Sequence, residues 1–280
     1  MRTWGPAAAA AGPPSSLARV KHLVAATALL ATLFAVAAGT AGTAGAAAPR
    51  GWRDGVASAE RYAQSRAGSI AFAVRSERGI AGRAVEASYP SASVVKAMFL
   101  VAYLRQPSVR SRPLRPDERD LLTPMVRWSS NKDASAISAK LGFGALARVA
   151  RRAGMTAFVE ATPDCWGCSR ITARDQTRFL LAIDRLLPKR HRAYGMGLLE
   201  RIVPRQRWGV ARAAPSGWRL YFKGGWGSGR GLVDHQVALL RRGRERVSVA
   251  VLTSGSPGHR YATETLRGVF ERLLRPLRRS

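Results

Sequence analysis

The chain has 280 residues, of which 46% are hydrophobic and 22% charged, and this balance excludes a disordered or collagenous protein. Its charge is extreme, because 46 Lys and Arg stand against 17 Asp and Glu, a formal net charge of +29, and only 6 of these 46 bases are lysine. With only two cysteines, the chain cannot be a small fold built on a disulfide framework.

The first segment has the three parts of a secretory signal peptide. Basic residues precede an apolar run over residues 23–38, which is shorter than the roughly 20 residues that a membrane-spanning helix needs. Small residues follow and include an Ala-x-Ala site that ends at Ala46. We therefore predict a signal peptide over residues 1–46 and a single secreted or extracytoplasmic domain over residues 47–280. An uncleaved signal would instead anchor this domain in the membrane.

A strong positive charge usually indicates a nucleic-acid partner. Export argues against such a partner, and arginine scattered along a chain is also what a GC-rich genome encodes by default. We therefore expect no nucleic-acid partner, although the basic surface would still adhere to anionic cell wall or membrane. We expect the protein to be a monomer.

The spacing of apolar residues predicts a helix, two strands, a helical block, three strands and a final helix. Two strands alone are marginally stable, so the early and late strands must share one sheet. The predicted fold class is α+β, with an antiparallel five-stranded sheet flanked by helices, an all-helical subdomain, and a cleft where the two parts meet. The α/β part takes residues 50–90 and 205–280, and the helical part takes residues 91–204. The predicted elements are a helix over 54–66, strands over 70–74 and 80–89, strands from 218, over 232–240 and over 246–252, and a helix over 262–274.

The first candidate site is a Ser-x-x-Lys sequence, Ser93 and Lys96, just before an apolar run over residues 97–104. Residues three apart lie on one face of a helix, and Ser91 is placed to cap that helix. A serine in the first turn lies among unpaired N–H groups that favour anionic character. Because a desolvated lysine can lose its proton and arginine effectively cannot, Lys96 is a candidate base for the hydroxyl. The alternative is a buried helix with a polar serine and a lysine that reaches solvent.

Two further polar motifs follow in the chain. Ser129 and Asn131 form a Ser-x-Asn sequence that holds the only asparagine of the chain, and its alternative interpretation is a helix-capping turn. Lys223, followed by Gly224 and Gly225, ends a predicted strand, where glycine lets a backbone approach a ligand closely. The alternative for this third motif is an ordinary turn.

Together and in this order, the three motifs resemble those of the penicillin-recognising serine enzymes, the family of class A β-lactamases and D,D-peptidases. The resemblance covers essentially the whole predicted domain. It implies that Ser93 is the nucleophile and that Lys96 accepts its proton during acylation. It also implies that Ser129 relays a proton to the leaving nitrogen, and that Asn131 orients Lys96 and binds a substrate amide.

The resemblance also assigns the third motif to substrate binding. Lys223 would supply positive charge near the substrate carboxylate, with Gly224 and Gly225 lining the site. The N–H of Trp226 would form an oxyanion hole together with the N–H of the nucleophilic serine. Gly224 stands where the family usually has a hydroxyl that binds the substrate carboxylate, and Arg230 would take over that contact.

The connection over residues 160–172 departs from the family pattern. Class A β-lactamases carry a longer loop there, with a glutamate that activates the deacylating water. Inside this connection the sequence offers only Asp164, a shorter acid. A positioned general base supplies a factor of roughly 10² to 10⁴, so we expect slow hydrolysis of a β-lactam adduct.

Cys165 and Cys168 form a Cys-x-x-Cys sequence in the same connection. An exported protein favours a disulfide between them. Zinc would need more ligands than these cysteines and a few scattered histidines provide, so we expect no metal site. A thioredoxin-like role lacks the surrounding βαβ pattern.

His235 follows Asp234 in a predicted strand, so a Ser/His/Asp triad is a further alternative, but no Gly-x-Ser-x-Gly elbow supports it. We predict an exported serine hydrolase that forms an acyl-enzyme on Ser93, acts on β-lactam amides and needs no cofactor. One alternative is a D,D-carboxypeptidase or penicillin-binding enzyme that acts on peptidoglycan stem peptides. Another is a degenerate, non-catalytic wall-binding protein that uses the same cleft.

Overall fold

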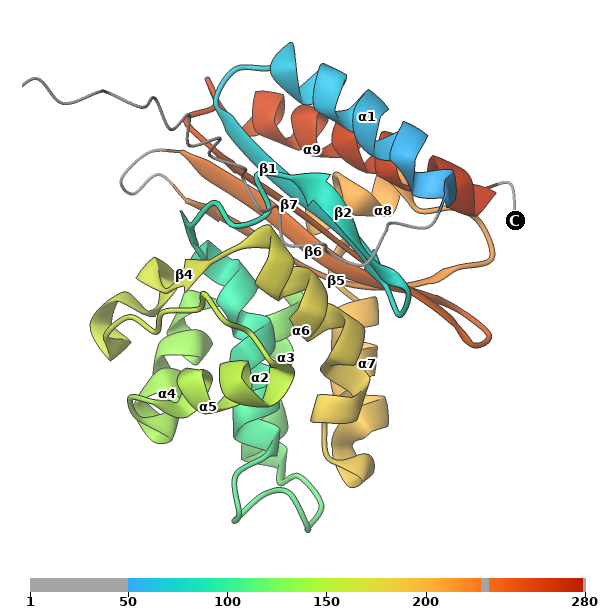
Figure 1. Cartoon of the computed structure of the whole chain (residues 1–280). Helices are drawn as coiled ribbons and strands as arrows, with labels where there is room; N and C mark the ends of the chain where they lie inside the picture. Colours follow the sequence, from blue (N-terminus) through green and yellow to red (C-terminus); the bar gives the residue numbers. More distant parts are fainter. Residues whose placement is uncertain (1–49, 228–231, 279–280) are drawn as a thin grey trace, which may run out of the picture. The chain divides into compact units, whose positions relative to one another are not determined.

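A five-stranded antiparallel sheet forms the centre of the computed structural model, which describes residues 50–227 and 232–278 (Figure 1). The strand order is β2-β1-β7-β6-β5, so the two early strands pair with the late ones as predicted. The fold is α+β, with the predicted sheet and helices. The strands are β1 (Ser69–Ser76), β2 (Gly79–Arg83), β5 (Arg219–Gly227), β6 (Val233–Arg242) and β7 (Glu245–Ser254).

Helices cover both faces of this sheet. On one face α1 (Arg50–Gln64) and α9 (His259–Leu273) lie side by side, with the short α8 (Val210–Ala213) packed against α9 (Figure 1). On the other face α6 (Ala173–Leu186) packs against β1, β6 and β7. The first eight residues of β6 are all buried, as expected of a central strand that is covered on both sides.

The helical part is built around α2 (Lys96–Leu104). All nine of its residues are buried, because a helix that is apolar on every side must be enclosed by its neighbours. The helices that pack against it are α3 (Pro116–Arg127), α4 (Asn131–Leu141), α5 (Ala145–Ala153) and α7 (Arg192–Glu200). These helices enclose α2, including Lys96 at its first residue.

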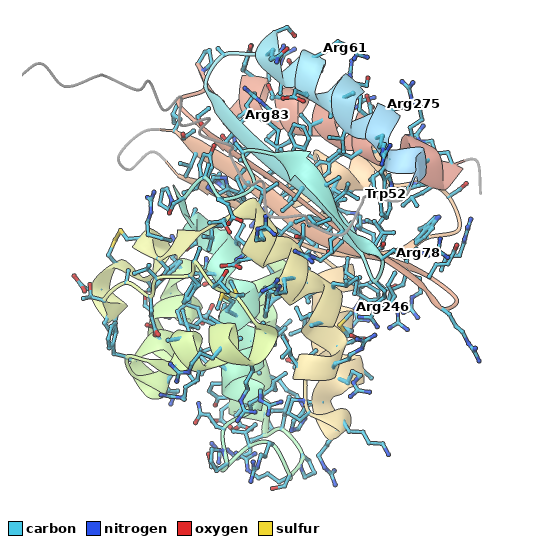
Figure 2. The ribbon with its side chains drawn as sticks, in the orientation of Figure 1. Trp52, Arg61, Arg78, Arg83, Arg246 and Arg275 are labelled. Carbon is cyan, nitrogen blue, oxygen red and sulfur yellow. A yellow bond between two sulfur atoms is a disulfide. The ribbon has the colours of Figure 1, made fainter. Side chains whose placement is uncertain are left out.

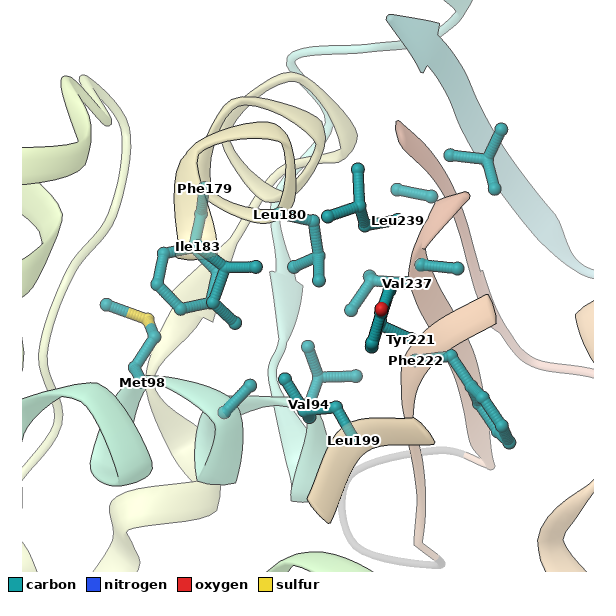
Figure 3. Packing of buried hydrophobic residues seen from close by; sticks show 14 of the residues in the cluster. Val94, Met98, Phe179, Leu180, Ile183, Leu199, Tyr221, Phe222, Val237 and Leu239 are labelled. Atoms are coloured by element: carbon teal, nitrogen blue, oxygen red, sulfur yellow. The ribbon is translucent and has the colours of Figure 1, made fainter. Parts of the chain in front are cut away.

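One hydrophobic core joins the helical part to the sheet. In Figure 3, α6 presents Phe179 and Ile183 toward Met98 of α2, and Leu180 toward Leu239 of β6. Helix α6 therefore lies between the two parts and fixes α2 relative to the strands.

The predicted strand over 80–89 proves to be two separate elements. Strand β2 ends at Arg83 because the next residue, Ala84, has a left-handed backbone with φ of +48°, which does not continue a strand. Further along, Tyr89–Pro90 (β3) pairs with Arg170–Ile171 (β4) in a small sheet of its own. This pairing ties the segment before Ser93 to the connection that departs from the family pattern.

In the described residues, short 3₁₀ helices complete the connections. They are η1 (Ala92–Val95), η2 (Pro163–Cys168), η3 (Lys189–His191), η4 (Pro204–Gln206) and η5 (Arg275–Arg278). Of the helices in this part of the chain, none has the length and apolar character needed to cross a membrane. The predicted signal peptide lies outside the described residues.

The arginines that make the chain so basic emerge from many elements. Figure 2 labels Arg61 on α1, Arg83 on β2 and Arg275 in η5 among them. Some are used structurally, since Arg246 of β7 forms an ion pair of 2.6 Å with Asp184 of α6.

Candidate active site

Ser93 lies in η1, the 3₁₀ turn that leads into α2. The preceding Ala92 has a left-handed backbone, with φ of +44°, and the N–H of Ser91 donates to the carbonyl of Ser169 at 2.7 Å. Ser91 does not cap the helix as expected, because its hydroxyl is turned toward the connection and donates to the carbonyl of Gly167 at 3.2 Å. Ser93 is 9% exposed, and its own hydroxyl has no hydrogen-bond partner within the described part of the chain.

Strand β5 reaches this turn because Gly225 has no side chain. A Cβ at Gly225 would lie 2.8 Å from the backbone nitrogens of Ser93 and Val94, which is closer than carbon can pack against them. At Gly224 the same atom would meet the Trp208 ring at 3.5 Å, an ordinary contact. The close backbone approach expected of these glycines is therefore made to the turn that carries Ser93.

The Lys96 amine is fully buried and is held by the segment between α3 and α4. Its Nζ donates to the carbonyl of Ser129 at 2.5 Å and to Oδ1 of Asn131 at 2.7 Å, and it lies 3.3 Å from the hydroxyl of Ser129. Ser130 caps α4 by accepting a hydrogen bond from the N–H of Asp133. The helix-capping turn is therefore present, and it brings Ser129 and Asn131 to Lys96. Ser129 has a left-handed backbone, with φ of +61°, as is common at functional sites.

A second buried lysine meets the same serine hydroxyl. Nζ of Lys223 donates to Oγ of Ser129 at 3.0 Å and to the carbonyl of Gly224 at 2.7 Å. Burial lowers the pKa of Lys96 to about 7, against an opposing effect of the Asp133 charge. Burial, together with the charge of Lys96, lowers the pKa of Lys223 well below its usual range. Because neighbouring positive charges disfavour each other, a neutral amine is available beside Ser129 near pH 7.

Trp226, the predicted second oxyanion donor, lies near the end of β5. Its ring packs against Trp208 and His259, with centroids 6.1 Å away in both cases. The side chain is therefore held in an aromatic cluster beside the site. Arg230, the predicted carboxylate contact, lies outside the described residues.

His235 does not form a triad with Ser93. It is buried, with Nε2 2.9 Å from the carbonyl of Pro90, and its Nδ1 accepts from the N–H of Thr253. Burial lowers its pKa to about 4, so it stays neutral at physiological pH. Asp234 is paired with His259 at 2.5 Å instead. The triad alternative is therefore wrong, and His235 serves to join strands to the segment before the nucleophile.

Both acids of the connection over 160–172 are engaged away from Lys96. The exposed Asp164 accepts hydrogen bonds from Thr162 and from backbone N–H groups of its own turn, which lower its pKa. Glu160 accepts three backbone N–H groups at the start of α5. Neither carboxylate therefore replaces the glutamate that the family resemblance leads us to seek here.

Nothing in the sequence pattern singled out Trp166, yet its ring lies over the Lys96 amine, with Nζ 4.9 Å from the ring centroid. Its indole N–H donates to Oγ of Ser135 on α4 at 3.2 Å, and a disulfide joins Cys165 to Cys168 on either side of it. The sequence feature that could have identified Trp166 is its position between Cys165 and Cys168. In the described ranges, no cluster of three or more His, Cys, Asp or Glu is arranged to hold a metal ion.

The same fold occurs in solved β-lactamase structures. A β-lactamase from Sphaerobacter thermophilus DSM 20745 is 17% identical, with a TM-score of 0.66 over 80% of this chain and 97% of that one. A class A β-lactamase from Mycobacterium abscessus is 18% identical, with a TM-score of 0.66 over 80% and 99%. A structure of PBP-A is 15% identical, with a TM-score of 0.65 over 79% and 96%. At these identities the likeness shows the fold.

Family membership rests on a sequence comparison. A search of curated proteins found no match. The model of the Beta-lactamase enzyme family matches residues 108–273, a span that includes Ser129, Asn131 and Lys223 and begins after Lys96. Because this span is more than half of the sequence, the chain belongs to the Beta-lactamase enzyme family.

Proposed function

We propose that this protein is an exported serine hydrolase that opens β-lactam amides through an acyl-enzyme on Ser93. The observation that carries the proposal is the pair of buried lysines, Lys96 and Lys223, whose amines share the hydroxyl of Ser129. One of them lies a single turn beyond Ser93, and its pKa of about 7 makes it a base at neutral pH. Arginine, the common base of this chain, could not do this.

Acylation begins when the Ser93 hydroxyl gives its proton to the neutral amine of Lys96. The serine oxygen attacks the carbonyl carbon of the substrate amide, and the carbon–nitrogen bond then breaks. The hydroxyl of Ser129 gives a proton to the leaving nitrogen and regains one from the lysine pair, which its contacts with Lys96 and Lys223 support. The transfers among Ser129, Lys96 and Lys223 thus pass between groups that are already in contact, whereas the Ser93 hydroxyl must approach Lys96 for the first step.

The proposal also assigns substrate contacts to the remaining residues. The N–H groups of Ser93 and Trp226 stabilise the oxyanion, as the close approach of β5 to the Ser93 turn supports. Asn131 binds the substrate amide while it holds Lys96. Lys223 supplies positive charge for the substrate carboxylate, and the family resemblance assigns a second contact with this carboxylate to Arg230, which lies outside the described residues.

A D,D-carboxypeptidase or penicillin-binding enzyme, which acts on peptidoglycan stem peptides, is the second candidate. The connection over 160–172 favours it, because Asp164 and Glu160 are engaged elsewhere. Without a positioned base for water, a β-lactam adduct is lost slowly. Such an enzyme would hold the drug as a persistent adduct on Ser93.

The place of action is part of the proposal. Residues 1–46 carry the pattern of a signal peptide, and residues 47–280 form the exported domain. Residues 1–46 hold three basic residues and no acidic one, so the exported domain keeps a net charge of +26, which supports its adhesion to anionic cell wall.

Covalent labelling with a fluorescent penicillin tests the proposal. The wild-type domain should become labelled, and Ser93→Ala should not. Label that survives in this variant, or that moves to Ser129, would place the nucleophile elsewhere. A wild-type domain that never takes up label would favour the non-catalytic wall-binding protein.

Product analysis separates the two enzymatic candidates. A β-lactamase should release hydrolysed drug repeatedly and leave stem peptides intact. A D,D-carboxypeptidase should release terminal D-alanine from purified stem peptides and accumulate the drug adduct.

A further inference from the structure

The indole ring of Trp166 fills the space beside Lys96 on the side of the connection. The hydrogen bonds of the amine go to Ser129 and Asn131. The ring centroid lies 4.9 Å from Nζ. A water held between them would need about 2.9 Å for its hydrogen bond to the amine and about 3.5 Å more for contact with the ring. Together these exceed the observed separation, so no water fits between the amine and the ring.

The ring is fixed by its own loop and by two helices. Its N–H donates to Oγ of Ser135 on α4, and it packs edge to face on Phe99 of α2, with centroids 6.0 Å apart. The disulfide between Cys165 and Cys168 closes the loop around Trp166. A side chain held from three directions cannot swing away without breaking these contacts.

The same loop is fastened to the turn that carries the nucleophile. The hydroxyl of Ser91 donates to the carbonyl of Gly167, and the N–H of Ser91 donates to the carbonyl of Ser169. Gly167 also lies beside the backbone of Ala92, where an added Cβ would meet Cα at an ordinary contact distance of 3.7 Å. The loop and the Ser93 turn therefore form one packed unit, so the ring stays in place whenever that turn is intact.

We infer that Trp166 is a positioning residue that keeps hydrolytic water away from Lys96 and so makes the acyl-enzyme on Ser93 long-lived. This inference rests on the proposed function. The Trp166 ring gives a second reason for slow hydrolysis, besides the lack of a carboxylate that activates water. Hydrolysis needs a water that gives a proton to the Lys96 amine while its oxygen attacks the ester carbonyl. The bond between that carbon and the serine oxygen then breaks, the carboxylic acid leaves, and the serine regains the proton from Lys96. The ring occupies space beside Lys96 from which such a water would otherwise hydrogen-bond to the amine.

The test compares Trp166→Ala and Trp166→Phe with the wild type after acylation by benzylpenicillin and removal of free drug. Intact mass spectrometry then follows the adduct on Ser93. Trp166→Ala should shorten the adduct half-life at least about tenfold, because water reaches a base. Trp166→Phe keeps an aromatic face on Lys96 and should retain most of the lifetime. Phe143→Ala, which truncates an aromatic side chain that is 64% exposed, is the matched control and should leave the half-life unchanged.

A second readout separates positioning from a merely structural role. The charged and titratable groups that act on Lys96 are Asp133 of α4 and Lys223 of β5, and neither is changed in Trp166→Ala. Removing the ring admits water, which favours the charged amine and raises the pKa of Lys96. The pH at which acylation reaches half its maximal rate should therefore move to higher values. General loosening of the fold would instead slow acylation at every pH.

The outcomes are distinguishable. A wild type that never acylates overturns the proposed function and this inference with it. A wild type that acylates, with the same adduct half-life in Trp166→Ala, overturns the inference alone. Should Trp166→Ala not fold, the double variant Cys165→Ser/Cys168→Ser releases the loop and should also shorten the half-life. An unchanged half-life in a folded double variant would show that the clamped ring is not the barrier.

Discussion

The two sides of the Lys96 amine differ completely in chemistry. On the side of α4 and β5 lie a hydroxyl, an amide and a second amine, all in hydrogen-bonded contact. On the side of the connection over 160–172 lies an aromatic ring that can neither accept nor deliver a proton at Lys96. The difference teaches that forming the adduct and removing it depend on separate pieces of chain. A change in the connection over 160–172 can therefore alter the lifetime of the adduct while the hydrogen-bonded groups around Lys96 stay the same.

Replacing Lys96 should have the largest effect on the rate of acylation. Lys96→Arg keeps the positive charge but removes the dissociable proton, so acylation should slow about 10²- to 10⁴-fold. Lys96→Ala should be nearly as inactive, which makes it the reference for complete loss. The measurement is the rate of fluorescent penicillin incorporation. An arginine variant within a few-fold of the wild type would mean that Lys96 acts through its charge.

The turn that carries Ser93 can also be displaced without changing any polar side chain around Lys96. Gly225→Ala puts a methyl group against the backbone of Ser93 and Val94, so the turn or β5 must shift. A displacement of about 1 Å at a reacting group can cost about 10²-fold in rate. Gly224→Ala is the matched control, because its methyl group meets only side chains at ordinary distance, the Trp208 ring at 3.5 Å and Gln236 at 3.7 Å. Equal acylation rates for the two variants would contradict the close approach of β5.

The pH dependence of acylation should follow the protonation of Lys96. Its pKa is lowered to about 7 by burial, and the neutral amine is the active form. Below this value the rate should fall about tenfold per pH unit, and above it the rate should level off. Stopped-flow acylation between pH 5 and pH 9, at roughly the ionic strength of the labelling assay, gives the profile. A rate that stays flat through this range would remove Lys96 as the base.

The smallest effect is expected from a substitution in the connection over 160–172. Asp164→Asn should leave the adduct half-life unchanged, since this exposed carboxylate is hydrogen-bonded within its own turn. Intact mass after removal of free drug measures the half-life. A markedly longer-lived adduct in this variant would identify Asp164 as the base for water and would blur the contrast between the two sides.

Much of the polar side was predictable because its residues are chemically unusual in this chain. Lysine is rare, Asn131 is unique, and two glycines follow Lys223. The prediction that the strand ends at Lys223 was wrong, because β5 continues through both glycines to Gly227. The order of the strands and helices was predictable as well, because alternating and helical spacing are local signals.

The other side was not predictable, because its interactions join residues far apart in the sequence. Trp166 meets Lys96 only because the pairing of β3 with β4 folds the connection back over the Ser93 turn. The partner of Asp234 is His259, on a later helix, rather than the adjacent His235. The end of β2 depends on a left-handed backbone at Ala84, a conformation that alanine rarely adopts.

Ala92 and Ser129 place left-handed backbone on both flanks of the candidate site. Each such residue costs about 1 to 3 kcal/mol, so the rest of the fold must hold them in place. Engineering that sought a more heat-resistant protein would find these positions first, since glycine adopts the same conformation without strain. Glycine would also let the Ser93 turn and the Ser129 segment relax in other directions, and at position 129 it would remove the hydroxyl that contacts both lysines. Thermal robustness and reactivity are therefore opposed at these two positions.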